Sequence, residues 1–81
     1  MPRFYFDLHN DEDVLDREGK ELSGLDEARK VAVAEAREMI CASVENGKID
    51  LNHFIEVRDE AGKTVHRLHF GQAVRIVPEN A

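Results

Sequence analysis

The sequence predicts an α+β fold with two layers, in which one long helix packs on a mostly antiparallel sheet of three to four strands, in the order β-β-α-β-β. Residues 25–46 are rich in alanine and carry apolar side chains three and four positions apart, which is typical of an amphipathic helix. Residues 2–9 and 53–59 alternate between apolar and polar side chains, which is typical of half-buried strands. A chain of 81 residues has room for one such domain, over residues 1–81.

The first strand is expected at residues 2–9. Its apolar side chains of one parity should face the core, and these are Phe4, Phe6 and Leu8. Residues 10–22 then contain a polar loop, the apolar pair Val14–Leu15 and a turn that ends at Gly19. We therefore expect residues 3–22 to form a hairpin whose second arm is irregular.

The long helix carries start and stop signals. Ser23 followed by Asp26 three residues later matches a capping box, and Gly47 after Asn46 can end the helix in a left-handed conformation. At about 100° per residue, one apolar stripe should face the sheet. It contains Leu25, Ala28, Ala32, Ala36, Met39, Ile40 and Ser43.

The helix is longer than the sheet it covers. About 22 residues give roughly 33 Å of helix, whereas a seven-residue strand spans roughly 23 Å. Val31 and Cys41 also lie off the main stripe. These two residues are therefore the candidate contacts of a homodimer.

The last third of the chain predicts a second hairpin, with strands at residues 53–59 and 64–70 around a turn at Gly62. The apolar residues of the returning strand do not share one parity, so we expect a β-bulge near His66 and Arg67. Residues 71–77 are compatible with either a short helix or a terminal strand.

A helix on one face of a small sheet leaves the other face for water or for a partner. By strand parity, three larger side chains should lie on that open face: Tyr5, Phe54 and Arg58. They are the candidate binding face.

The sequence predicts no catalytic residue, no metal site and no cofactor, and hence no enzyme. The acidic residues 11–18 fail the calcium-loop pattern, because Leu15 and Asp16 occupy positions that need an oxygen ligand and a glycine. His66 and His69 would diverge on a strand, which disfavours a zinc site. Cys41 has no base and orienting group in a recognisable pattern.

Charge and composition narrow the classes of partner. A formal net charge of −6 disfavours a nonspecific nucleic-acid binder, which normally carries a basic footprint. No apolar run is long enough to span a membrane, and the opening lacks the pattern of a secretory signal. With a single cysteine, the chain is expected to be cytoplasmic.

Several motifs together resemble a known family. These are the opening MPRFYFDL, the turn Asp16–Gly19 followed by Glu21 and Leu22, the Glu27–Arg29 segment of the helix, and Ile55–Gly62. They are similar to a family of small single-domain proteins of unknown function from rhizobia and related alphaproteobacteria. The resemblance runs from Met1 to about Phe70. It implies a compact, bacterial, cytoplasmic protein and no chemistry.

The favoured hypothesis is a non-catalytic interaction or regulatory module whose partner is another protein or a second copy, a homodimer being one such arrangement. Its basis is the acidic surface, the long helix and the open sheet face. The alternative is a small-molecule or metal-binding protein that uses its surface histidines, of which the chain has four.

Overall fold

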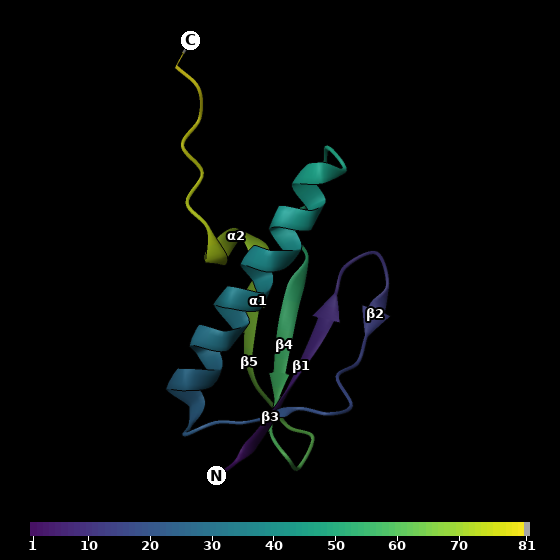
Figure 1. Ribbon diagram of the computed structural model, residues 1–81, viewed down its shortest axis with the longest axis vertical. Coiled ribbons are helices and arrows are strands. Elements are labelled where there is room, and N and C mark those ends of the chain that lie inside the picture. Colours follow the sequence, from purple (N-terminus) through teal and green to yellow (C-terminus); the bar gives the residue numbers. More distant parts are fainter. Residues whose placement is uncertain (81) are drawn as a thin grey trace.

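The computed structural model describes residues 1–80 and has an α+β fold (Figure 1). Its strands are β1 (Arg3–His9), β2 (Asp13–Val14), β3 (Lys20–Glu21), β4 (Phe54–Arg58) and β5 (Thr64–His69). Its helices are α1 (Leu25–Glu45) and α2 (Phe70–Ala73). The predicted fold class is confirmed, and the sheet has five strands because the second arm of the first hairpin is divided in two.

The strand order is β2-β1-β4-β5, all neighbours are antiparallel, and β3 pairs with the first half of β1. Between β2 and β3 a side chain takes the place of the missing strand. The Asp16 carboxylate accepts the backbone N–H of Phe6 at 3.1 Å and that of Gly19 at 3.1 Å. The arm is irregular as predicted, and where no strand pairs with β1 the Asp16 carboxylate accepts the hydrogen bond of the β1 backbone.

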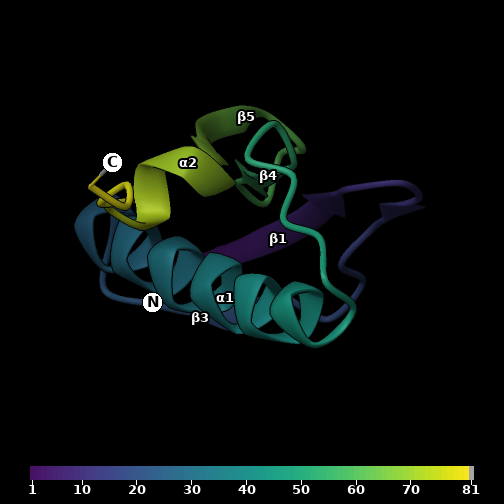
Figure 2. The same ribbon diagram turned by 90° about the horizontal axis from the view of Figure 1, so that it is seen from above.

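One core lies between the sheet and the helices. Both helices lie on the same side of the sheet, and α1 crosses it obliquely (Figures 1 and 2). The buried residues of α1 are Ala28, Ala32, Ala36 and Ile40, and the sheet supplies Phe4, Phe6, Ile55, Val57 and Leu68. Leu8 is partly buried against this core. The predicted parities of β1 and β4 are thus confirmed, and the small alanines let α1 approach the strands closely.

The start of α1 differs from the prediction. Gly24 is the residue that caps the helix, with an extended backbone (φ 171°, ψ −170°) and no side-chain hydrogen bond. The Ser23–Asp26 capping box is therefore wrong. The carboxylate that reaches back is that of Glu27, which accepts the N–H of Ser23 at 3.1 Å, while Asp26 pairs with Arg29. The helix end is as predicted, with Gly47 at φ 79°.

The bulge of the second hairpin lies at Val65 and not at His66 and Arg67. Val57 pairs with His66 while Arg58 pairs with Thr64, so Val65 is the extra residue. This position turns Val65 to the core and keeps Leu68 opposite Ile55. The predicted strand ends at Phe70, so its bulge has to bring three apolar residues, Val65, Leu68 and Phe70, to one side. Phe70 instead begins α2 and enters the core from there.

Residues 71–77 form a short helix only in their first part, and the expected terminal strand does not form. The short helix α2 ends at Ala73, and Arg37 of α1 fixes that end by donating from Nε to the Ala73 carbonyl at 2.8 Å. Residues 74–80, which we call the tail, contain no helix or strand and project away from the body (Figure 1).

Candidate functional site

The sheet face opposite α1, which we call the outer face, carries a polar cluster on β1 and β4. The register places Tyr5 opposite Arg58, Asp7 opposite Glu56 and His9 opposite Phe54. The three residues of the predicted binding face therefore lie on one face. However, Tyr5 and Arg58 are at one end of the paired strands and Phe54 is at the other, with charged residues between them.

Asp7 is the most buried charged residue of this face, with 1% of its surface exposed. Its carboxylate accepts hydrogen bonds from Nε and Nη2 of Arg58, the latter at 3.1 Å, and from the backbone N–H of Asp16 at 2.9 Å. Burial pushes the pKa of Asp7 upward, but these hydrogen bonds outweigh it, and the pKa lies below its ordinary value. Asp7 is therefore an ionised carboxylate held inside the fold.

Arg58 has a structural task. Besides Asp7, its Nη2 donates to the Asp16 carbonyl at 3.3 Å, and its guanidinium lies 5.2 Å from the centre of the Tyr5 ring. The hydrogen bond to Asp7 raises the pKa of Arg58. These contacts use Nε and Nη2, so Arg58 joins the strands to the loop, and only Nη1 has no hydrogen bond within residues 1–80.

Phe54 is covered by neighbouring side chains at the other end of the face. Its ring stacks on His9 with centroids 4.6 Å apart and an interplanar angle of 20°, and it touches the His69 ring at 5.3 Å. The Arg67 guanidinium lies 4.8 Å from the Phe54 centroid and also donates to Glu56 at 2.8 Å. Phe54 thus contacts two histidine rings and one guanidinium group.

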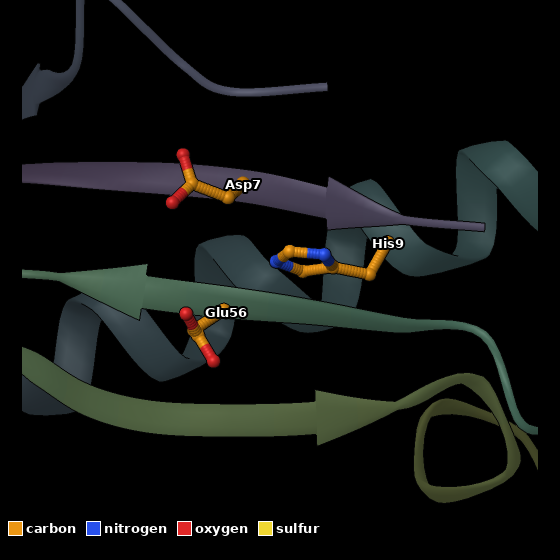
Figure 3. Close-up of side chains that lie close together, drawn as sticks. All are labelled: Asp7, His9 and Glu56. Atoms are coloured by element: carbon orange, nitrogen blue, oxygen red, sulfur yellow. The ribbon is translucent and has the colours of Figure 1, made fainter. Parts of the chain in front are cut away.

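His9 stacks on Phe54 and also lies close to Asp7 and Glu56. Its Nδ1 lies 2.8 Å from the Asp13 carboxylate, and its Nε2 is buried with no hydrogen-bond partner among residues 1–80. One donor atom each from Asp7, His9 and Glu56 lies within 4.8 Å of the others. Figure 3 shows the far end of the imidazole pointing to the space between the two carboxylates.

This trio was missed by the sequence analysis. Asp7 and His9 are two apart on a strand, so strand parity alone places them on one face. Glu56 joins them only through the register of β1 with β4, in which Asp7 and Glu56 are partners. That register is not readable from either strand alone.

The other histidines do not converge. His66 pairs with Val57 on the helix side, where burial and the nearby Arg29 charge lower its pKa, whereas His69 pairs with Phe54 on the outer face. A zinc site made of His66 and His69 is therefore excluded by strand parity, as the sequence indicated. His53 lies 3.4 Å from the carboxylate of Asp50.

The two residues predicted for a dimer contact have different surroundings. Val31 is half-buried and packs against the core, whereas Cys41 is exposed and has no disulfide partner. They are ten residues apart on α1, which is about 15 Å along the helix. They do not form one continuous patch.

A groove of about 620 Å³ lies on the helix side, between α1 and the second arm of the first hairpin. Its apolar residues are Phe6, Leu8, Val14, Leu15, Met39 and Ile55, and its charged residues are Asp16, Arg17, Glu18, Lys20, Glu35 and Glu38. Val14 and Leu15 are 54% and 59% exposed. The helix covers β4 and β5 but leaves β2 open, which creates this groove (Figure 1).

The tail exposes apolar side chains as well. Ile76 is 57% exposed and Val77 is 75% exposed, and Arg75 precedes them. These two neighbouring apolar side chains are free to contact another surface.

The core and these two surfaces define a small α+β domain. The chain belongs to the family described as a domain of unknown function, DUF6894, whose model matches residues 3–71. The predicted membership of such a family is confirmed, and the bacterial origin stays a prediction. No curated protein and no solved structure matches the chain. The tail lies beyond the matched range.

Within residues 1–80, neither α1 nor α2 combines the length and the apolar character needed to cross a membrane.

Proposed function

We propose that the protein is a non-catalytic interaction module that forms a homodimer, in which the groove of each copy binds the tail of the other. The single observation that carries this proposal is an open apolar groove with an acidic rim in a molecule whose own tail exposes Ile76 and Val77 next to Arg75. A regulatory role would follow from the equilibrium between free and occupied grooves. The reducing cytoplasm is the compartment we propose, since Cys41 is unpaired and exposed.

The chemistry of the groove matches that of the tail. Glu38 on α1 provides negative charge for Arg75, and the walls at Leu15 and Met39 are apolar enough for Ile76 and Val77. Lys20 is paired with Glu35 at 3.0 Å, so the charge of that carboxylate is already balanced and Glu38 is the α1 carboxylate left for Arg75. The volume of the groove is within the range of pockets that enclose small ligands, about 300–1,000 Å³. It has room for a few side chains.

The occupant is the tail of a second copy because α1 separates the groove from the tail of the same copy. The contact of Arg37 with Ala73 fixes the start of the tail beside α2, on the β5 side of α1. The groove opens on the β2 side of the same helix. A tail that folded back would have to cross the exposed surface of α1, whereas a second copy can present its tail directly.

The dimer should be weak. Fully burying an Ile or Val side chain contributes about 1.5–3 kcal/mol, and reciprocal exchange buries four of them. Association costs about 4–15 kcal/mol in lost translational and rotational freedom and in side-chain ordering. We therefore expect a dissociation constant of about 1 μM or higher. The free energy of association is then no more favourable than about −8 kcal/mol.

Light scattering coupled to gel filtration, over a concentration series, tests the proposal. The wild type should shift from monomer to dimer mass as concentration rises. Replacing both Ile76 and Val77 with Asp should leave a monomer, and so should Leu15→Asp. Val44→Asp is the matched control, because Val44 is 56% exposed and lies outside the groove.

Mixing the two monomeric variants sharpens the test. The Leu15→Asp protein keeps an intact tail, and the tail variant keeps an intact groove, so one of the two contacts can re-form between them. A mixed dimer is expected only at the highest concentrations and weaker than the wild-type dimer, because it buries two side chains and not four. A wild type that stays monomeric at about 1 mM, a concentration at which −4 kcal/mol is enough for binding, overturns the proposal.

The contact predicted at Val31 and Cys41 is the competing interface. Cys41→Glu places a charge on the exposed helix surface and leaves the groove and the tail unchanged. If this variant abolishes the dimer while the tail variant retains it, the interface is on α1 and tail exchange is wrong.

A further inference from the structure

We infer that Asp7, His9 and Glu56 bind a divalent transition-metal ion on the outer face, and that Zn²⁺ is the ion that fits their donor atoms. The inference does not depend on the dimer, because the groove and the trio lie on opposite faces of the sheet. It extends the alternative that histidines bind a metal, with a different histidine and two carboxylates.

His9 is positioned as a metal-binding histidine. Its Nδ1 faces the Asp13 carboxylate at 2.8 Å, and its ring is held flat against Phe54. Metal-binding histidines usually donate the other ring N–H to a carboxylate in this way, which fixes the tautomer and leaves Nε2 as the ligand. A buried polar atom without a partner is costly. The His9 Nε2 is such an atom, and an ion between the carboxylates would satisfy it.

The two carboxylates retain free lone pairs. Asp7 Oδ1 accepts two hydrogen bonds and Oδ2 accepts one, and because each carboxylate oxygen has two lone pairs, one lone pair remains, on Oδ2. Glu56 uses Oε2 for Arg67, and its Oε1 has no hydrogen bond to the part of the chain that the structure describes. Three ligand atoms are thus available, one from each residue.

The spacing of the ligand atoms allows closure around an ion. Zinc–ligand bonds of about 2.0–2.2 Å in tetrahedral geometry place ligand atoms about 3.3 Å apart. The three ligand atoms now lie within 4.8 Å of one another. A change of one side-chain rotamer can shorten these distances by the difference. Glu56 is held by one side-chain contact, the Arg67 hydrogen bond at 2.8 Å, and is the residue that would rotate, while Asp7 and His9 are each fixed by two or more contacts.

The local charge also favours a dication. Four carboxylates contribute to the cluster, from Asp7, Asp13, Asp16 and Glu56, and two guanidinium groups oppose them, from Arg58 and Arg67. Four negative and two positive charges leave −2 when His9 is neutral. A divalent ion brings this sum to zero, although the Arg58 guanidinium on Asp7 will limit the affinity.

The donor set selects the kind of ion. One imidazole nitrogen with two carboxylate oxygens suits Zn²⁺, whereas Ca²⁺ and Mg²⁺ prefer oxygen ligands alone. Three protein ligands leave one tetrahedral position for water. The Irving–Williams order places Zn²⁺ affinity above that of Mn²⁺ or Fe²⁺ at the same site.

Calorimetric titration of the chelator-treated full chain with ZnCl₂ tests the inference, with native mass spectrometry to count ions. We expect one Zn²⁺ per chain. His9→Ala should weaken binding by at least about a hundredfold, and Glu56→Gln by at least about tenfold, since even loss of a supporting group costs about 10–100-fold. His69→Ala is the matched control, because this exposed histidine also touches Phe54 but lies outside the trio. It should change affinity by less than about threefold.

A second measurement uses the unaltered protein and so does not depend on the folding of a variant. Long-range ¹H–¹⁵N spectra of the histidine rings should show that Zn²⁺ shifts Nε2 of His9 and leaves His66 and His69 unshifted. Absence of binding at 100 μM Zn²⁺, equal affinity of wild type and His9→Ala, or shifts at another histidine would each overturn the inference. The Ile76 and Val77 double variant should bind Zn²⁺ like wild type, which separates this result from that of the dimer.

Discussion

Phe6 and Asp7 are neighbours in β1, yet they belong to two differently constructed faces. Phe6 points to α1 and is 6% exposed, while Asp7 points away from the helix and is 1% exposed. The helix face is filled by apolar side chains from five elements, β1, α1, β4, β5 and α2. The outer face buries a charge as completely as the core buries a phenylalanine, without any helix above it. Side chains and one loop provide that burial.

The two kinds of burial have different requirements. Apolar packing is nondirectional, and its contribution grows with the area removed from water. A buried carboxylate needs specific donors in specific directions, and Asp7 obtains them from Arg58 and the Asp16 backbone. The helix face should therefore lose stability in proportion to volume removed, and the outer face should lose it when a single donor or acceptor changes.

The largest expected effect is on the helix face. Phe6→Ala removes a buried ring and leaves a cavity against α1, so the free energy of unfolding should fall by about 3–5 kcal/mol. Urea denaturation at neutral pH measures it. Tyr5→Ala, on the neighbouring half-buried position of the outer face, is the comparison and should cost clearly less. Equal costs would contradict the contrast between the faces.

The next effect is on the outer face. Asp7→Asn keeps the shape but leaves the Arg58 guanidinium without its charged partner. Breaking a buried pair costs about 3–5 kcal/mol, and partial exposure of Arg58 reduces this, so we expect about 2–4 kcal/mol at pH 7. The same denaturation experiment measures it.

The pH dependence identifies the cause of that loss. Because the folded-state pKa of Asp7 lies below its ordinary value of 3.8, the carboxylate adds stability that is fully present above the unfolded-state pKa. The contribution disappears as pH falls through the lower folded-state pKa. The difference between wild type and Asp7→Asn should therefore be constant above about pH 5 and narrow below about pH 4. A difference that does not change with pH would mean that packing, and not charge, is responsible.

The sequence predicts the helix face much better than the outer face. Phe4, Phe6, Ile55 and Val57 were placed correctly because strand parity is local and burial follows from it. Local sequence patterns predicted the wrong position where contacts with other residues determine the backbone conformation. Gly24 replaced Ser23 as the cap, and the bulge moved to Val65 once Phe70 joined α2.

The candidate sites depended on tertiary information that no local pattern contains. Arg58 was predicted as a binding residue from its parity, but its Nε and Nη2 bind Asp7, which lies 51 positions earlier in the chain. The Asp7–His9–Glu56 trio needs the register of β1 with β4. The groove needs the angle at which α1 crosses the sheet, which leaves β2 uncovered (Figure 1).

A smaller loss of stability is expected at Gly19, in the segment between β2 and β3 that lies against the edge of β1. Gly19 has φ 68°, and a Cβ there would lie 2.8 Å from the Phe4 carbonyl oxygen and 2.9 Å from the Tyr5 ring. Gly19→Ala should lower the free energy of unfolding by about 1–3 kcal/mol. Gly62→Ala is the matched control, since its φ of 83° carries similar strain but its Cβ would meet open space. Equal losses at both sites would mean that the close approach to β1 is unimportant.

The smallest effect on stability is expected at Glu56. Its ion pair with Arg67 is largely open to water, because the Arg67 side chain is 53% exposed, and such pairs contribute about 0–1 kcal/mol. Glu56→Gln should therefore change the free energy of unfolding by less than about 1 kcal/mol without added metal. With Zn²⁺ in excess, wild type should gain stability from binding, and this variant should gain less because it lacks one ligand. Two carboxylates facing each other across β1 and β4 would then differ in their tasks, because Asp7 serves both the fold and the ion, whereas Glu56 serves mainly the ion. A loss at Glu56 as large as that at Asp7, independent of Zn²⁺, would instead mean that the whole cluster serves the fold alone.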